Sequence, residues 1–153
     1  MVMELSRVKP RLAAAPRGKP NKQVSIAVVG CGYWGAKHVR VLSTLPEVGY
    51  LVAVDGAESV RSSIAATFPA LDTSPDLQSV IHSVDAVVVA TPPRDHATVA
   101  LQAMRAGKHV LIEKPLAASL IESRALVAEA ARSDVVLMVG HTFEYHPALR
   151  EIG

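Results

Sequence analysis

The chain has 153 residues, half of them apolar, which is enough to build the core of one domain. Its single cysteine excludes an internal disulfide and the multi-cysteine zinc patterns, and indicates a reducing compartment such as the cytoplasm. The net charge of +2 arises in residues 1–22, where six basic residues and one acid give 6 − 1 = +5 and leave −3 for the remainder, so a nucleic-acid-binding surface is not expected.

Residues 1–22 are expected to form a disordered basic tail, because they contain three prolines and no apolar periodicity. The stretch lacks the continuous apolar core of a secretory signal. Its arginine-rich, acid-poor composition fits a transit peptide, an extended start or a cloning scar equally well. No run in the chain approaches the ~18 apolar residues of a membrane-spanning helix.

Beyond the tail, short apolar strands alternate with amphipathic helices. Strands are predicted at 24–30, 50–55, 85–91, 109–113 and 135–140, and the loop 69–76 leaves room for a very short one. Helices are predicted at 33–45, 57–68, 95–107 and 119–133, with a short helix from Asp76 through His82. Strands this apolar are covered on both faces, so the predicted fold class is α/β: a doubly wound, mainly parallel sheet of the Rossmann type, in a single domain over 23–145.

The first strand runs into "GCGYWG", in which Gly30, Gly32 and Gly35 have the spacing G-x-G-x-x-G at the start of a helix. In this setting the first glycine makes a tight turn, the second lets backbone amides approach a pyrophosphate, and the third lets helix and strand pack closely. The helix N-terminus favours the phosphate charge. The motif therefore indicates a dinucleotide site.

Asp55 ends the second strand, 55 − 35 = 20 residues after Gly35, where an acid that binds the adenosine ribose is expected. Its carboxylate would accept both ribose hydroxyls and repel a 2′-phosphate, so NAD is predicted in preference to NADP. Two other interpretations are a structural glycine turn without a ligand and a methyltransferase, although methyltransferases usually have a more compact glycine pattern.

Thr91, Pro92 and Pro93 follow the next strand, at the sheet edge where ligands of open α/β sheets bind. Two consecutive prolines must end the strand. Two interpretations are open. The stiff backbone forms a wall for an adenine or nicotinamide ring, or the prolines simply separate the strand from the helix.

The motifs "GCGYWG", Asp55, "ATPPRDH", "AGKHVLIEKPLA" and "GHTFEYHPALR" occur in this order and together resemble the Gfo/Idh/MocA oxidoreductases over about residues 24–152. The last motif is similar more particularly to members acting on nucleotide sugars. The resemblance implies hydride exchange between a nicotinamide cofactor and a sugar, polyol or nucleotide-sugar hydroxyl. It makes Lys114, otherwise a surface lysine in a loop, the catalytic lysine of a Glu-Lys-Pro motif. It also implies cofactor contacts for Gly30, Gly32, Tyr33, Trp34, Gly35, Asp55, Thr91, Pro92, His96, Glu113 and Lys114.

Members of the family normally continue into a second α/β domain, which supplies most of the substrate pocket, a catalytic histidine and the interface of a homo-oligomer. The chain is expected to lack that domain, with residues 146–153 beginning the linker helix toward it. Two hypotheses follow: a fragment of an NAD(P)-dependent oxidoreductase, or a non-catalytic dinucleotide-binding module or regulator.

The segment "HTFEYH" contains two histidines and a glutamate, but its spacing matches no helical zinc motif and no metal is expected. Two interpretations are open for Tyr145 and His146: they line a substrate pocket, or they have core or surface roles. His38 and His82 are predicted to be solvated or packed on helices. Cys31 is required only to be small, with a modest redox sensitivity conceivable.

Overall fold

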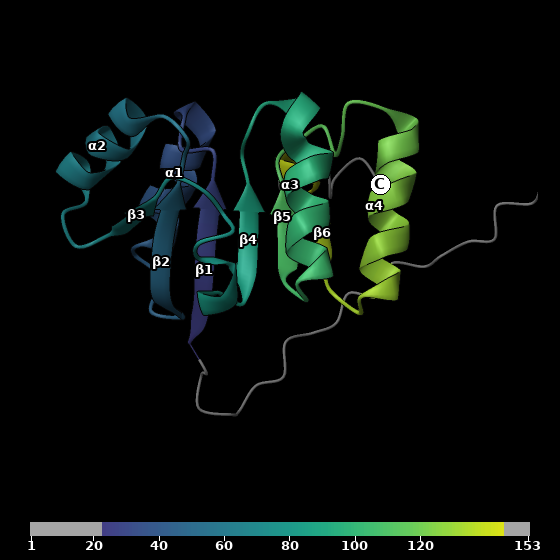
Figure 1. Ribbon diagram of the computed structural model, residues 1–153, viewed down its shortest axis with the longest axis horizontal. Helices are drawn as coiled ribbons and strands as arrows, with labels where there is room; N and C mark the ends of the chain where they lie inside the picture. Colours follow the sequence, from purple (N-terminus) through teal and green to yellow (C-terminus); the bar gives the residue numbers. More distant parts are fainter. Residues whose placement is uncertain (1–22, 146–153) are drawn as a thin grey trace, which may run out of the picture.

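Six parallel strands form the centre of the structure, a computed structural model that describes residues 23–145 (Figure 1). The strands are β1 (Val24–Val29), β2 (Val48–Val54), β3 (Asp72–Ser74), β4 (Ala86–Val89), β5 (His109–Ile112) and β6 (Leu137–Val139). All pairings between neighbours are parallel, and the order is β3-β2-β1-β4-β5-β6. The order reverses direction between β1 and β4, which confirms the predicted doubly wound Rossmann type.

Four α-helices connect the strands. They are α1 (Tyr33–Leu42), α2 (Glu58–Thr67), α3 (Pro93–Arg105) and α4 (Leu120–Arg132), with short 3-10 helices η1 (Ile81–Ser83) and η2 (Thr142–Tyr145). Figure 1 shows α3 and α4 on the near side of the sheet and α1 behind it. None of the helices between residues 23 and 145 has the length and apolar character needed to cross a bilayer.

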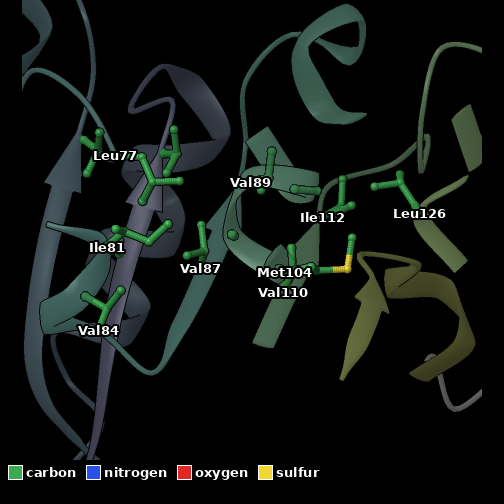
Figure 2. Packing of buried hydrophobic residues seen from close by; sticks show 14 of the residues in the cluster. Leu77, Ile81, Val84, Val87, Val89, Met104, Val110, Ile112 and Leu126 are labelled. Carbon is green, nitrogen blue, oxygen red and sulfur yellow. The ribbon is translucent and has the colours of Figure 1, made fainter. Parts of the chain in front are cut away.

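Apolar side chains cover both faces of the sheet and form two clusters. Along β1, Ala27 and Val29 belong to the cluster under α3 and α4, whereas Val28 belongs to the cluster under α1 and α2. Figure 2 shows the first cluster, in which Met104 of α3 and Leu126 of α4 pack with residues of β4 and β5. Each such fully buried side chain contributes about 1.5–3 kcal/mol. This two-sided burial explains why the strands read as continuous apolar runs.

The helix ends follow the expected local signals. Gly107, after α3, has φ +73°, the left-handed conformation that a glycine C-terminal cap supplies. Ser119 caps α4: its Oγ accepts the Glu122 N–H at 3.2 Å and donates to the Glu122 carboxylate at 3.0 Å. The capping pair is therefore confirmed.

Most predicted elements differ in extent by a few residues; α1, for example, ends at Leu42 and not at residue 45, and β2 begins at Val48 and not at residue 50. Helix α3 begins at Pro93, not Asp95, because proline fits the first helical turn, where its missing N–H costs nothing. The predicted helix from Asp76 to His82 is a turn followed by η1: the Asp76 carboxylate accepts the Ser79 N–H at 2.9 Å. Three apolar residues of this segment are buried in the core: Leu77, Ile81 and Val84.

The strand predicted over 135–140 is shorter in the structure, where β6 covers Leu137–Val139. The predicted tail, residues 1–22, and the predicted linker helix, residues 146–153, lie outside the described residues.

Candidate functional site

The carboxyl ends of the parallel strands bring the predicted site residues to one edge of the sheet. Gly30 follows β1 and lies between Asp55, after β2, and Thr91, after β4. Glu113 follows β5 and Gly140 follows β6, farther along the same edge. Residues distant in sequence therefore share one crevice, the usual ligand site of such a sheet.

The three glycines of the first turn have different roles. Gly30 has φ +85°, and a Cβ there would meet the Thr91 backbone nitrogen at 2.7 Å. A Cβ on Gly35 would overlap the Gly30 carbonyl oxygen, so close packing of α1 on β1 requires glycine. A Cβ on Gly32 would meet nothing within 4 Å. The chain therefore leaves open space beside Gly32, at the N-terminus of α1, where backbone N–H groups favour an anion.

The Asp55 carboxylate is held against this turn by two backbone donors. Its Oδ2 accepts the Cys31 N–H at 2.8 Å and its Oδ1 accepts the Ala57 N–H at 2.9 Å. Each oxygen keeps lone pairs for further donors, such as ribose hydroxyls. Asp55 also borders a hollow of about 290 Å³ whose lining combines glycine, apolar and acidic residues: Gly30, Gly56, Asp76, Leu77, Thr91 and Pro92 among them. Its position and the carboxylate acceptors of Asp55 beside it suit an adenosine.

Cys31 is a packing residue. Its side chain is buried, and burial together with the nearby negative charge of Asp55 raises the pKa of the thiol to about 12. The group is therefore a protonated thiol at neutral pH, which is the unreactive form.

His96 lies between the loop that follows β4 and the loop that follows β5. Its side chain is 1% exposed, with Nε2 lying 2.8 Å from the Thr91 carbonyl oxygen and Nδ1 2.8 Å from the Pro115 carbonyl oxygen. Both ring nitrogens thus face backbone carbonyl oxygens of the chain itself, of which a neutral imidazole donates to one, and the ring is not directed at a ligand. Thr91 Oγ1 is the one buried side-chain polar atom within residues 23–145 that lacks a hydrogen-bond partner.

Glu113 is buried and contacts a histidine that the sequence did not single out. Its Oε1 lies 2.8 Å from His38 Nε2, and its Oε2 accepts the Lys114 N–H at 3.2 Å. Gly140, at the end of β6, lies beside this carboxylate, since a Cβ built there would be 3.4 Å from it, an ordinary van der Waals contact. His38, predicted to be merely solvated or packed, therefore joins α1 to the end of β5. Its helical position three residues after Gly35 was the available signal.

Lys114 is exposed and lies on the same side of the site as the first turn of α1. Its Nζ is 5.9 Å from the centroid of the Trp34 ring, and Lys37 Nζ is 5.2 Å from that ring. Tyr33 and Trp34 are 74% and 47% exposed, so these aromatic rings are available to a ligand. The arrangement gathers two cations and two aromatic side chains beside the glycine turn.

A second hollow, of about 380 Å³, is lined by Lys114, Gly140, His141, Thr142, Phe143 and Glu144. Tyr145, predicted to line a substrate pocket, is 65% exposed and does not line this hollow. His146 lies outside the described residues. In the part of the chain that the structure describes, no group of three or more His, Cys, Asp or Glu side chains is placed to hold a metal ion.

Comparison with known proteins identifies relatives of this domain. A model of the family GFO_IDH_MocA, described as "Oxidoreductase family, NAD-binding Rossmann fold", matches residues 24–141. The chain is 34% identical over 125 residues to 4-carboxy-2-hydroxymuconate-6-semialdehyde dehydrogenase of Sphingobium sp., covering 80% of the chain and 40% of that protein. It is 32% identical to UDP-N-acetylglucosamine 3-dehydrogenase of Acidithiobacillus ferrooxidans, covering 80% of the chain and 38% of that protein.

Among solved structures, the chain is similar to GenD2 from gentamicin A biosynthesis in complex with NAD. The TM-score is 0.78 and the identity 37%, over 88% of this chain and 39% of that one. The chain thus spans about 40% of the length of the curated relatives it matches.

Proposed function

Because the chain belongs to the Gfo/Idh/MocA family of NAD-binding oxidoreductases, we propose that it is the cofactor-binding part of a dehydrogenase acting on a hydroxyl-bearing carbon. The observation that carries the proposal is the Asp55 carboxylate, fixed across the glycine turn from the open space at Gly32. An acid on one side and free backbone amides on the other match the ribose and pyrophosphate of a dinucleotide.

The proposed roles follow from where each side chain lies. Asp55 accepts the hydroxyls of the adenosine ribose, and Thr91 with Pro92 forms a wall of the crevice. Bound NAD supplies the hydride acceptor. Lys114 hydrogen-bonds the reacting hydroxyl and helps to move its proton. Glu113 accepts a hydrogen bond from the Lys114 N–H. The buried His96 side chain helps to position the loops that carry the Thr91 and Pro115 carbonyls.

The proposed substrate is a sugar, polyol or nucleotide sugar. The support is the identity with a UDP-N-acetylglucosamine 3-dehydrogenase and with inositol 2-dehydrogenases, one of which is 38% identical over 119 residues. NAD is proposed over NADP because the Asp55 carboxylate would repel a 2′-phosphate. The domain limits 23–145, a cytoplasmic location and a homo-oligomeric whole protein remain predictions.

Cofactor binding can be measured with a reporter that the chain already contains. Trp34 is the single tryptophan and lies in the first turn of α1, so bound NADH should quench its emission by energy transfer. Asp55→Ala should weaken NADH binding by about tenfold or more, because a charge-assisted hydrogen bond to each hydroxyl is lost. Glu47→Ala, which removes an exposed acid at the opposite edge of the sheet, is the matched control.

The absence of quenching at millimolar NADH would contradict the proposal, as would equal effects of the two substitutions. NADH binding without hydride exchange on any sugar or polyol in the whole protein would favour the alternative, a non-catalytic dinucleotide-binding module.

A further inference from the structure

Two side chains of α1 contact the two charged residues that follow β5. Trp34 and His38 are four residues apart on α1, so they lie on the same face of that helix. Lys114 Nζ lies 5.9 Å from the centroid of the Trp34 ring, within the range in which a cation is attracted to an aromatic face. His38 Nε2 lies 2.8 Å from Glu113 Oε1. One helix face therefore contacts the lysine and the glutamate through separate residues.

The Glu113 carboxylate is not paired with the neighbouring ammonium group. Its Oε1 faces His38, and its Oε2 accepts the Lys114 backbone N–H at 3.2 Å. Within residues 23–145, none of the ion pairs joins Lys114 Nζ to a carboxylate, although Glu113 is the adjacent residue. Glu113 is buried and Lys114 is exposed. Two adjacent residues of opposite charge are therefore kept apart.

His38 accounts for the direction of the carboxylate. A carboxylate only accepts hydrogen bonds, so His38 Nε2 is the donor in this contact. A buried carboxylate that loses its donor is left in an unfavourable state, and the Lys114 ammonium is the cation next to it in the chain. Gly140, which lies beside the carboxylate, has no side chain that could replace the histidine. Without His38, we expect Glu113 to turn toward Lys114.

We propose that His38 is a positioning residue for Lys114: by holding the Glu113 carboxylate on the α1 side, it keeps the Lys114 ammonium free for the substrate. The inference rests on the proposed function for what Lys114 does there. An ammonium paired with a carboxylate gives up its proton less readily and has fewer N–H groups for a reacting hydroxyl. His38 therefore acts on the reaction without touching substrate or cofactor.

Other charged and titratable groups lie near Lys114. Lys37 lies near the same aromatic ring and carries a charge of the same sign. His141 and Glu144 line the hollow that Lys114 also lines, and Glu144 forms no ion pair with Lys114. A substitution at Glu113 alone therefore distinguishes its carboxylate from that of Glu144.

The acetylation rate of Lys114 reports whether its ammonium is paired, and the measurement needs neither cofactor nor substrate. Acetic anhydride reacts with the unprotonated amine, and mass spectrometry of peptides from the 153-residue chain gives a rate for each lysine. His38→Ala should slow the labelling of Lys114 by about twofold to fivefold, as expected for a new ion pair with one exposed partner. Lys108, at the other end of β5, is the internal control and should label at an unchanged rate.

Further variants separate the pairing from a general loss of structure. His38→Gln keeps an N–H donor for Glu113 and should restore the wild-type labelling of Lys114. Glu113→Gln removes the charge, so this variant and His38→Ala/Glu113→Gln should both label Lys114 at the wild-type rate. His82→Ala, at an exposed position of η1, is the matched histidine control and should change nothing. His38→Leu replaces His38→Ala if that variant does not fold.

Kinetics of the whole protein test the consequence for the reaction. His38→Ala should lower kcat for oxidation of inositol or a UDP-sugar by at least about tenfold, with NADH affinity within about threefold of wild type. The rise of kcat with pH should move to higher pH, because an ion pair favours the protonated form of the lysine. His38→Gln should recover most of kcat and the wild-type pH profile.

Three results would overturn the inference. The first is unchanged labelling of Lys114 in a folded His38→Ala or His38→Leu chain. The second is slow labelling that persists in His38→Ala/Glu113→Gln, which would assign the effect to another acid. The third is an active whole protein in which His38→Ala leaves kcat and its pH profile unchanged. If labelling behaves as expected but the whole protein exchanges no hydride, the positioning of Lys114 stands and the proposed function fails.

Discussion

His38 Nε2 lies 2.8 Å from Glu113 Oε1, which joins the helix that starts at the glycine turn to the strand end that carries Lys114. His38→Ala should lower the free energy of unfolding by about 1–3 kcal/mol, because it leaves the 8% exposed Glu113 without its side-chain partner. Urea unfolding measures the change. His82→Ala, at an exposed position of η1, should change stability by less than about 0.5 kcal/mol. Equal stability of the two variants would show that the pair stabilises nothing.

Two substitutions in the glycine turn should have different effects, one on the stability of the fold and the other on cofactor binding. Gly35→Ala should destabilise the fold by about 1–3 kcal/mol, because the added methyl overlaps the Gly30 carbonyl. Gly32→Ala should melt within about 0.5 kcal/mol of wild type, because its methyl meets nothing in the chain. The same methyl should weaken NADH binding about tenfold by filling the space proposed for the pyrophosphate. Thermal melts and Trp34 quenching give the two readouts, and a Gly32→Ala chain with wild-type NADH affinity would place the pyrophosphate elsewhere.

Lys114→Ala should separate binding from chemistry. NADH affinity should change by less than about threefold, since the side chain is proposed to act on the substrate hydroxyl. Hydride exchange with inositol or a UDP-sugar, followed by NADH absorbance in the whole protein, should fall by about 10²–10⁴-fold. Lys37→Ala, which removes the other cation beside Trp34, is the matched control and should retain turnover. Turnover that survives Lys114→Ala would assign the proton transfer to another group.

Cys31 should be inert in the folded chain. Because its thiol keeps a proton up to about pH 12, iodoacetamide at pH 8 should label the native protein far more slowly than the urea-unfolded protein. The unfolded thiol ionises nearer its ordinary pKa of 9.0, so this residue's contribution to the free energy of unfolding should fall as pH rises from about 9 toward 12. Equal labelling rates for native and unfolded protein would contradict this assignment.

Local sequence signals predicted much of the fold and part of the site. Gly30, Gly35 and Asp55 were found because a tight turn, a close packing contact and a strand-end acid each require a residue type at a fixed spacing. The same reasoning gave the parallel sheet, because strands apolar on both faces need helices on both sides.

The contacts that the sequence patterns did not predict are between residues far apart in the chain. His38 and Glu113 are 75 residues apart, and only the strand order brings them together. His96 was expected at the cofactor by resemblance alone, yet its side chain lies beneath the surface with both nitrogens facing backbone carbonyl oxygens. No spacing rule connects a helical histidine to carbonyls of two separate loops, so three-dimensional geometry was needed to place it.

That histidine has a consequence for protein engineering. Since one imidazole lies between a carbonyl of the loop after β4 and a carbonyl of the loop after β5, we expect that the two loops are best exchanged together. A chimaera that imports the Glu-Lys-Pro loop of a relative into this scaffold would need the donor's own histidine and its Thr-Pro turn as well. Grafts that cross between the two loops should lose register at Lys114, whereas grafts that carry both should keep it.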